Sequence, residues 1–374
     1  MFTGQYTYCG TNHPTVRGPY SGMICSGKWS SYSGMICSGA AVNNIVPWYS
    51  MHGVRRARPS AEALEQDKER SIFQAGLIRR ALVIRNDPEQ SVFDEEFEKK
   101  YSVVQRAIES NPDEYTLWAF RREILIAKSE SSSLTDDEWK SELQLTSLAL
   151  QRHPKAYPAW QHRLWLLSDR KHMSKVSQGL RDASLKEEQR LSAYMLSKDG
   201  RNFHGWAHRM RVRSILESKS PGEEENMWRQ ELEFVEGKIN DDFANYSAWH
   251  HRSVLLPRIH SEGPNIFLSD ELQFVRQAFY TEPDVQSAWF YHRWLLAGAP
   301  ARGNKAVVVD GLLEEELAAC EELLSIEKNA RYALQTKVHI LTKLGRQSET
   351  TEALDLLEKI DPLRRGYYRH LRKT

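Results

Sequence analysis

The sequence predicts an all-α fold, an α-solenoid in which helical hairpins stack one after another. The first observation behind this prediction is a tryptophan that recurs at intervals of 42, 46, 43 and 40 residues. The second is an apolar residue ten positions before each tryptophan. The five tryptophans are Trp118, Trp160, Trp206, Trp249 and Trp289, and the apolar residues are Ile108, Leu150, Leu196, Ile239 and Phe279.

The segment that leads to each of these apolar residues has the spacing of an amphipathic helix. In three copies the apolar residues follow steps of four, three and four, as in Phe97, Tyr101, Val104 and Ile108. The tryptophan then opens a second helix, because Trp160, Leu164 and Leu167 share one helical face. Prolines mark the turn in three of the pairs: Pro112, Pro154 and Pro283. A hairpin of this kind cannot bury its own apolar face, so successive hairpins must stack.

The two ends of the repeat region depart from the pattern. A sixth hairpin follows the fifth, with Leu334 where a tryptophan is expected. Terminal repeats are often degenerate because one side faces water. We expect capping helices near residues 71–84 and 351–360, and one superhelix over residues 51–374 with five clear repeats and this degenerate sixth.

The first fifty residues have a different composition. The string YSGMICSG occurs at 20–27 and again at 32–39, in a segment that is rich in Gly, Ser and Tyr and free of acidic residues. Such a segment cannot bury enough apolar surface to offset the entropy of ordering it. Residues 1–50 are therefore predicted to be disordered, or to be an extraneous extension that the folded protein does not need.

Composition limits the function classes. The chain has 51 basic and 50 acidic side chains, so it has no overall positive field for nucleic acid. It has no apolar run of eighteen residues and no secretory signal at its start, which predicts a cytoplasmic protein without a transmembrane segment. Its four cysteines do not form a paired metal-binding set, so we expect no metal in this chain.

Histidines and arginines also recur in step with the tryptophans. His162, His208 and His251 each stand two places after a tryptophan, and His292 stands three places after. Histidines that are one repeat apart do not converge on one ion, which argues against a metal site. The arginines follow one place later: Arg121, Arg163, Arg209, Arg252 and Arg293. We interpret them as an inter-repeat layer in which each guanidinium bonds to the adjacent turn.

Five strings carry a more specific signal. PDEYTLWAFRR, PKAYPAWQHR, RNFHGWAHR, FANYSAWHHR and PDVQSAWFYHR resemble the repeat of protein prenyltransferase α subunits. SAWFYHRWLL at 287–296 and IDPLRRGYYRHLR at 360–372 are similar to the Rab type within that family, the α subunit of geranylgeranyl transferase type II. Met51, His52 and Gly53 resemble the amino terminus of that type, which implies a native start at Met51.

The resemblance implies a function. In this family a crescent-shaped α subunit wraps a β subunit that holds the lipid pocket and the catalytic zinc. The Rab type transfers geranylgeranyl from geranylgeranyl diphosphate to C-terminal cysteines of Rab GTPases, which a Rab escort protein presents. One alternative is the α subunit shared by farnesyl transferase and geranylgeranyl transferase type I. The other is a non-enzymatic helical-repeat scaffold.

The resemblance also assigns candidate site residues. It implies that Lys155 contacts the departing diphosphate and that Arg201 assists it. It further implies that Tyr157 and His204 face the lipid and diphosphate, with Asn202 and Phe203 beside them, although contact with the β subunit is an equal alternative for this group. Pro158 stands where the farnesyl type has a glutamine that binds a substrate carboxylate, and proline has no side-chain donor.

Overall fold

The structure is a computed structural model that describes residues 60–85, 96–131, 134–169, 171–172, 174–217, 224–259, 265–297, 300–301, 304–305 and 310–372. All of these belong to one compact unit, Tyr49–Thr374. The expected extension over residues 1–50 and the expected start at Met51 lie outside the described residues.

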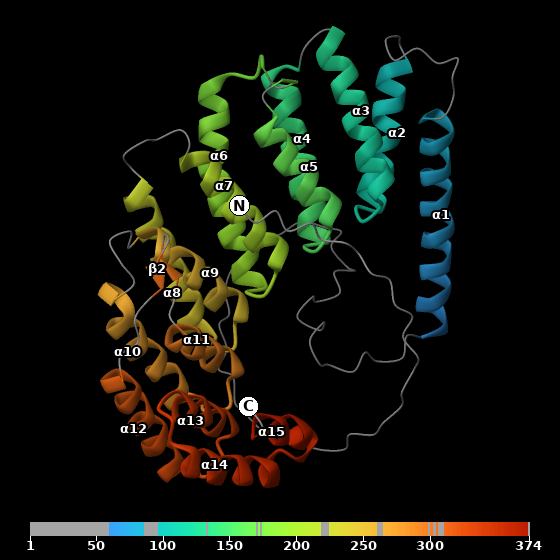
Figure 1. Ribbon diagram of the computed structural model, residues 1–374. Coiled ribbons are helices and arrows are strands. Elements are labelled where there is room, and N and C mark those ends of the chain that lie inside the picture. Colours follow the sequence, from blue (N-terminus) through green and yellow to red (C-terminus); the bar gives the residue numbers. More distant parts are fainter. Residues whose placement is uncertain are drawn as a thin grey trace, which may run out of the picture. The chain divides into compact units, whose positions relative to one another are not determined.

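Helices dominate the described part of the chain (Figure 1). They are α1 (Ala61–Arg85), α2 (Glu96–Ser110), α3 (Tyr115–Ser131), α4 (Asp136–Arg152), α5 (Tyr157–Ser168), α6 (Gln178–Lys198), α7 (Phe203–Glu217), α8 (Glu224–Asp241), α9 (Tyr246–Ile259), α10 (Asn265–Thr281), α11 (Gln286–Leu296), α12 (Asp310–Ile326), α13 (Arg331–Lys343), α14 (Gln347–Ile360) and α15 (Arg365–Leu371), with a 3-10 turn η2 (Pro362–Arg364). Between α11 and α12, β1 (Pro300–Ala301) and β2 (Asn304–Lys305) form an antiparallel pair of two residues each.

The helices pack as antiparallel hairpins in chain order. Each of α2/α3, α4/α5, α6/α7, α8/α9, α10/α11 and α12/α13 is a contacting pair. Second helices of neighbouring hairpins also contact one another, as α3 with α5, α5 with α7, α9 with α11, and α11 with α13. The predicted all-α solenoid of helical hairpins is therefore confirmed.

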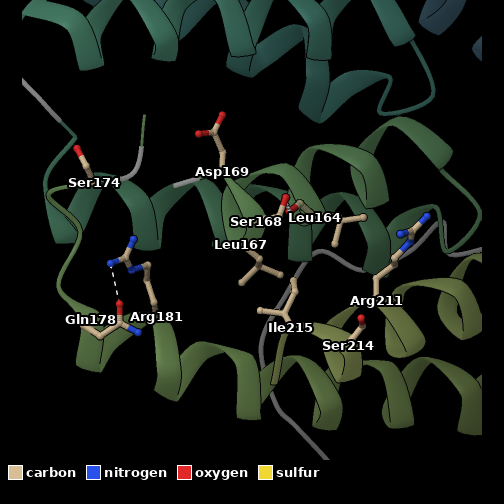
Figure 2. A pocket seen from close by; sticks show the side chains of 10 residues that line it. All are labelled: Leu164, Leu167, Ser168, Asp169, Ser174, Gln178, Arg181, Arg211, Ser214 and Ile215. Atoms are coloured by element: carbon tan, nitrogen blue, oxygen red, sulfur yellow. Dashed lines mark hydrogen bonds between the residues drawn. The ribbon is translucent and has the colours of Figure 1, made fainter. Parts of the chain in front are cut away.

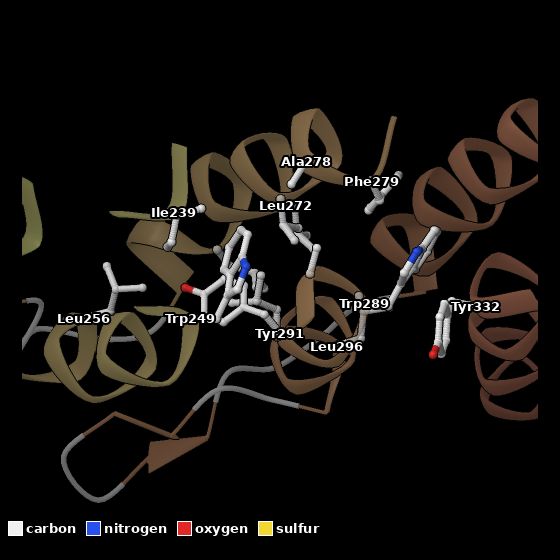
Figure 3. Packing of buried hydrophobic residues seen from close by; sticks show 14 of the residues in the cluster. Ile239, Trp249, Leu256, Leu272, Ala278, Phe279, Trp289, Tyr291, Leu296 and Tyr332 are labelled. Atoms are coloured by element: carbon white, nitrogen blue, oxygen red, sulfur yellow. The ribbon is translucent and has the colours of Figure 1, made fainter. Parts of the chain in front are cut away.

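The recurrent tryptophans lie in the core of this stack. All five indoles are at most 3% exposed, and the apolar residues ten positions earlier are at most 1% exposed. Each indole Nε1 donates a hydrogen bond to the carbonyl six residues earlier, as from Trp160 to Pro154 at 2.9 Å. The indole packs between helices (Figure 3), and its hydrogen bond also holds the turn that precedes its own helix.

The helices at the two ends of the stack are longer than predicted. α1 begins at Ala61, ten residues before the expected helix, and Ala81 is its one fully buried residue among those described. In the sixth hairpin Leu334 fills the tryptophan position and is 3% exposed, packed with Leu354, Leu357 and Tyr368 of the following helices. None of the helices described above has the length and apolar content needed to cross a membrane.

Candidate functional site

The candidate residues lie at one edge of the stack, where the first helix of each hairpin turns into the second. We call this the turn edge, meaning the turns at residues 111–114, 153–156, 199–202, 242–245 and 282–285. Side chains tie neighbouring turns together. Asn202 Nδ2 donates to the carbonyl of Pro154 at 2.9 Å, and Asn245 Nδ2 donates to the carbonyl of Gly200 at 2.8 Å. A Cβ at Gly200 would lie 3.1 Å from Asn245 Nδ2, so a larger residue here would have to displace the Asn245 side chain slightly.

Asn202 has a second function in its own turn. Its Oδ1 accepts hydrogen bonds from the backbone N–H groups of His204 and Gly205 at 3.1 and 3.2 Å, which caps the start of α7. Asn202 is only 1% exposed. The structure therefore places Asn202 beneath the surface, where it fixes the positions of its neighbours and does not face solvent.

Exposed aromatic residues line the turn edge. Four of the second helices begin with an aromatic residue three positions before the tryptophan: Tyr115, Tyr157, Phe203 and Tyr246. Their exposed fractions lie between 49% and 64%. Large apolar side chains of this kind usually lie in the core, so a row of exposed ones indicates an interaction surface.

Lys155 precedes the first residue of α5 by two positions and forms an ion pair across to the next turn. Its Nζ lies 3.1 Å from Asp199 Oδ2, and the two side chains are 39% and 10% exposed. Asp199 Oδ1 also accepts a hydrogen bond from the backbone N–H of Arg201 at 3.0 Å. Lys155 is therefore positioned by a largely buried carboxylate, yet its ammonium group is still accessible.

The Lys155 ion pair belongs to a repeated pattern. Arg201 Nη2 lies 3.0 Å from Asp242 Oδ2 in the following turn, and His153 Nδ1 lies 2.8 Å from Asp113 Oδ2 in the preceding one. In each pair, one residue stands five positions before its own tryptophan, and the other stands seven positions before the tryptophan of the next repeat. Turn-to-turn pairing thus recurs at three successive junctions between four repeats, and Arg201 is directed toward Asp242, away from Lys155.

His204 connects Lys155 with the exposed rings. Its ring centroid lies 5.5 Å from that of Tyr157 and 3.9 Å from that of Phe203. Burial lowers the pKa of His204, and the positive charge of Lys155 lowers it further. The imidazole is therefore neutral at pH 7 and can donate one hydrogen bond without adding charge. The structure brings Lys155, Tyr157, Phe203 and His204 together, with Asn202 beneath them and Arg201 directed elsewhere.

A second regular feature, which was not predicted from the sequence, lies inside the stack. A buried glutamate stands eighteen positions before each of the last four recurrent tryptophans and before Leu334. These residues are Glu142, Glu188, Glu231, Glu271 and Glu316, each at most 4% exposed. Their intervals of 46, 43, 40 and 45 residues match the tryptophan period, which was the signal that could have revealed them.

Each glutamate joins two neighbouring repeats. Glu188 in α6 accepts two hydrogen bonds from Arg163 of the preceding hairpin, at 2.7 and 2.6 Å, and one from His208 of its own hairpin, at 2.8 Å. Glu142 has the same partners one repeat earlier, Arg121 and His162. Burial alone would raise the pKa of Glu142, but the hydrogen bond from His162 and the charge of Arg121 lower it to about 2.

These contacts correct the expected bonding of the arginines and account for the regular spacing of the histidines. The arginines do not bond chiefly to the adjacent turn, because Arg163 and its counterparts bind a carboxylate on the first helix of the next hairpin. Arg293 makes no such contact. The buried histidines His162, His208 and His292 each share a glutamate with a cation. Over the residues that the structure describes, no group of three or more His, Cys, Asp or Glu side chains could hold a metal ion.

A groove of about 900 Å³ opens between α5, α6 and α7 (Figure 2). Leu164, Leu167 and Ile215 form its apolar part, and Arg181 and Arg211 lie toward its two ends. Arg181 Nη2 donates to Gln178 Oε1 at 2.8 Å. The α5 residues of the groove come from the carboxyl half of that helix, whereas Lys155 and Tyr157 stand at its amino end, and none of the candidate site residues lines the groove.

Comparison with known proteins places the repeats in a family. The model of the protein prenyltransferase alpha subunit repeat matches residues 97–127, 139–170, 228–259 and 268–299. The chain is 29% identical over 347 residues to the geranylgeranyl transferase type-2 subunit alpha of Saccharomyces cerevisiae, with 86% of this chain and 98% of that protein covered. It is 40% identical over 146 residues to the protein of the same name from Rattus norvegicus, with 37% of this chain covered.

The coverage of the mammalian relative is partial, since the matched segment spans only 22% of the length of the rat protein. Among solved structures, a chain of Candida albicans protein geranylgeranyltransferase-I complexed with GGPP matches with a TM-score of 0.58 and 20% identity. The match covers 86% of this chain and 95% of that one. At this identity the likeness concerns the fold, and it supports the helical-hairpin architecture described above.

Proposed function

Because the chain belongs to the protein prenyltransferase α-subunit family, we propose that it is the α subunit of a type-2 geranylgeranyl transferase. In this proposal it acts in the cytoplasm as one half of a heterodimer, which transfers geranylgeranyl from geranylgeranyl diphosphate to cysteine thiols of Rab GTPases. The observation that carries the proposal is the cluster of Lys155, Tyr157 and His204 at the turn edge.

The chemistry of prenyl transfer gives this cluster a function. A thiolate sulfur forms a bond to C1 of the prenyl group while the C1–O bond breaks, and diphosphate leaves with the electron pair. Negative charge grows on the departing oxygen, so a cation and hydrogen-bond donors placed there lower the barrier. Lys155 supplies a cation, Tyr157 an O–H donor and neutral His204 an N–H donor, and the positive end of the α5 helix dipole adds to them.

The carboxylate of Asp199 partly neutralises the positive charge of Lys155. The ion pair at 3.1 Å places the ammonium group at the turn edge. The Asp199 carboxylate would compete with a diphosphate for the ammonium group. A diphosphate carries more negative charge than one carboxylate, so it can share or take over the ammonium when it is bound.

The remaining parts of the reaction are assigned to a partner. The exposed aromatic row at the turn edge offers an apolar surface on which a β subunit could pack. Within the proposal, this β subunit contributes the lipid pocket and the zinc that stabilises the attacking thiolate. Pro158 stands in the first turn of α5 and has no side-chain donor, which agrees with substrates that are presented by an escort protein.

The test is assembly followed by activity. The chain is co-expressed separately with a type-2 β subunit, a farnesyl transferase β subunit and a type-I β subunit, and the complexes are isolated. A stable complex with the type-2 subunit that transfers geranylgeranyl to a Rab protein in the presence of its escort protein supports the proposal. Assembly with the farnesyl or type-I β subunit alone supports the shared α subunit instead. A chain that binds none of the three is a scaffold.

A further inference from the structure

The fifth hairpin deviates from the ion-pair pattern by one residue. In the second to fourth hairpins, histidine stands two places after the tryptophan and arginine three places after. After Trp289 these two places hold Tyr291 and His292, and the arginine, Arg293, stands four places after. One extra position on a helix rotates a side chain by about 100°, so Arg293 cannot point where Arg252 points in the previous hairpin.

Other residues replace Arg293 in the stack. Tyr291 donates its hydroxyl to Glu271 at 2.6 Å, as the histidine does in other hairpins. His292 lies 2.7 Å from Glu316 in α12, and Arg276 of α10 supplies the cation to the same carboxylate through its Nε at 3.0 Å. The contact between the fifth and sixth hairpins is therefore complete without Arg293.

Arg293 is a half-buried cation, and no carboxylate in the described part of the chain neutralises it. It makes no hydrogen bond or ion pair with any residue that the structure describes, and its guanidinium lies 4.9 Å from the centre of the Phe290 ring. Burial lowers the pKa of Arg293, and the groups that oppose this effect are the phenols of Tyr367 and Tyr332. A half-buried cation without an anion is unfavourable, so such a position is usually completed by an anionic group.

Lys343 of α13 is a second basic residue in the surroundings of Arg293, and the imidazole of His339 beside them is neutral at pH 7. His339 of α13 lies near Arg293, and burial together with the charges of Lys343 and Arg293 lowers the pKa of His339 to about 4. Lys343 Nζ donates a hydrogen bond to the carbonyl of Leu296 at 2.6 Å, which holds its amino group at this place. This surface has a local excess of cations, and its complement is an acidic group.

The position of Arg293 links it to the exposed aromatic row. Residues three before, one after and four after the tryptophan lie on one face of a helix. The stacking of Tyr246 on His250 in α9, with ring centroids 6.3 Å apart, shows this face in the fourth hairpin. In α11 the same face carries Phe290, which is 41% exposed, and Arg293. Tyr367 near Arg293 is 54% exposed.

We propose that Arg293 binds an acidic side chain of the partner β subunit, with the exposed rings of Phe290 and Tyr367 packing around that contact. The proposal rests on the proposed function, because it needs a partner that covers this face. The proposed ionic contact lies in the fifth hairpin, whereas the Lys155 cluster lies in the second and third hairpins.

The experiment measures the dissociation constant between the full chain and a purified type-2 β subunit at two salt concentrations. Arg293→Glu should weaken binding by at least roughly tenfold, Arg293→Gln by less, and Arg293→Lys least, with the differences shrinking at high salt. Arg106→Glu is the matched control, since Arg106 is an exposed arginine on α2, a first helix, with no partner among the described residues. This control should bind as the unaltered chain does.

A thermal unfolding measurement separates binding from folding. Arg293→Gln removes a cation that makes no hydrogen bond, so the isolated chain should melt at the same or a higher temperature. A lower melting temperature together with unchanged binding would assign Arg293 to the fold and overturn the inference. Equal binding by the unaltered chain and Arg293→Glu would overturn the inference alone. Failure of the unaltered chain to bind the β subunit would overturn the proposed function and this inference with it.

Discussion

Arg163 of α5 donates two hydrogen bonds to the carboxylate of Glu188 in α6, the first helix of the following hairpin. Both side chains are buried, at 7% and 1% exposure. An ion pair removed from water in this way stabilises the fold little on balance, because desolvation offsets most of the attraction. Removal of one partner, however, leaves the other buried without compensation, so the pair strongly favours one register of stacking.

The first prediction concerns this pair. Glu188→Gln removes the charge that compensates Arg163 and His208, and it should lower the free energy of unfolding by about 3 to 5 kcal/mol in urea denaturation. The neighbouring Glu187→Gln is the control, because Glu187 pairs with Arg190 at an exposed surface and should cost less than about 1 kcal/mol. Equal losses in the two variants would show that the buried carboxylate does not hold the repeats together.

The second prediction concerns the indole layer. Trp160→Ala removes a ring that is 3% exposed and a hydrogen bond to Pro154, so it should lower the free energy of unfolding by about 3 to 5 kcal/mol. Tyr157→Ala changes an aromatic residue of the same helix that is 49% exposed. Its effect on unfolding should be much smaller, within about 1 kcal/mol. A comparable loss at Tyr157 would argue against its assignment to an interaction surface.

The sequence predicted the helical hairpins because burial of apolar residues follows the helical period, and indoles such as Trp118 mark every repeat. It did not reveal the buried glutamates. A charged residue such as Glu271 is typical of a helix surface, and only its recurrence in step with the tryptophans hinted at burial; its partners Arg252 and Tyr291 are seen in the structure. The single shift of register at Arg293 is visible in the sequence, but its consequence depends on which carboxylates lie within reach.

The candidate site was predictable in part. The resemblance to prenyltransferase α subunits pointed to Lys155, Tyr157 and His204. The packing of α5 against α7 brings these residues together. Two features could not be foreseen from spacing. One is the pairing of Lys155 with Asp199, since the distance between consecutive turns is set by the packing of whole helices. The other is the burial of Asn202, whose side chain fixes two turns and faces no solvent.

The third prediction concerns pH. His251 stacks on Trp206 with ring centroids 4.5 Å apart. Burial, together with the charges of His250 and Arg209, lowers its pKa from 6.5 to about 4, and the charge of Glu231 opposes this shift. Between these pH values the unfolded chain binds a proton that the folded chain does not, so the free energy of unfolding falls as the pH is lowered from 6.5 to 4. The contribution of this one group is about 3 kcal/mol.

His251→Phe should remove this contribution, because phenylalanine keeps a flat ring against Trp206 and has no titrating group. Thermal unfolding of the variant and the unaltered chain at pH 7 and pH 4.5 gives the comparison, and other titrating groups cancel in the difference. The unaltered chain should lose more stability than the variant on acidification. Parallel losses would mean that His251 takes up its proton in the folded chain as readily as in the unfolded one.

The last prediction concerns Lys155 and separates chemistry from architecture. In the heterodimer, Lys155→Ala should lower single-turnover prenyl transfer by about ten to a few hundredfold, the scale of losing one charged contact to a developing anion. Lys155→Arg should restore part of the rate, since it returns the positive charge. His153→Ala is the control, because His153 forms the equivalent turn-to-turn pair with Asp113 one repeat earlier. If the rate loss came only from a weakened turn edge, His153→Ala would slow transfer as much as Lys155→Ala does, and the ammonium group would have no part in the departure of diphosphate.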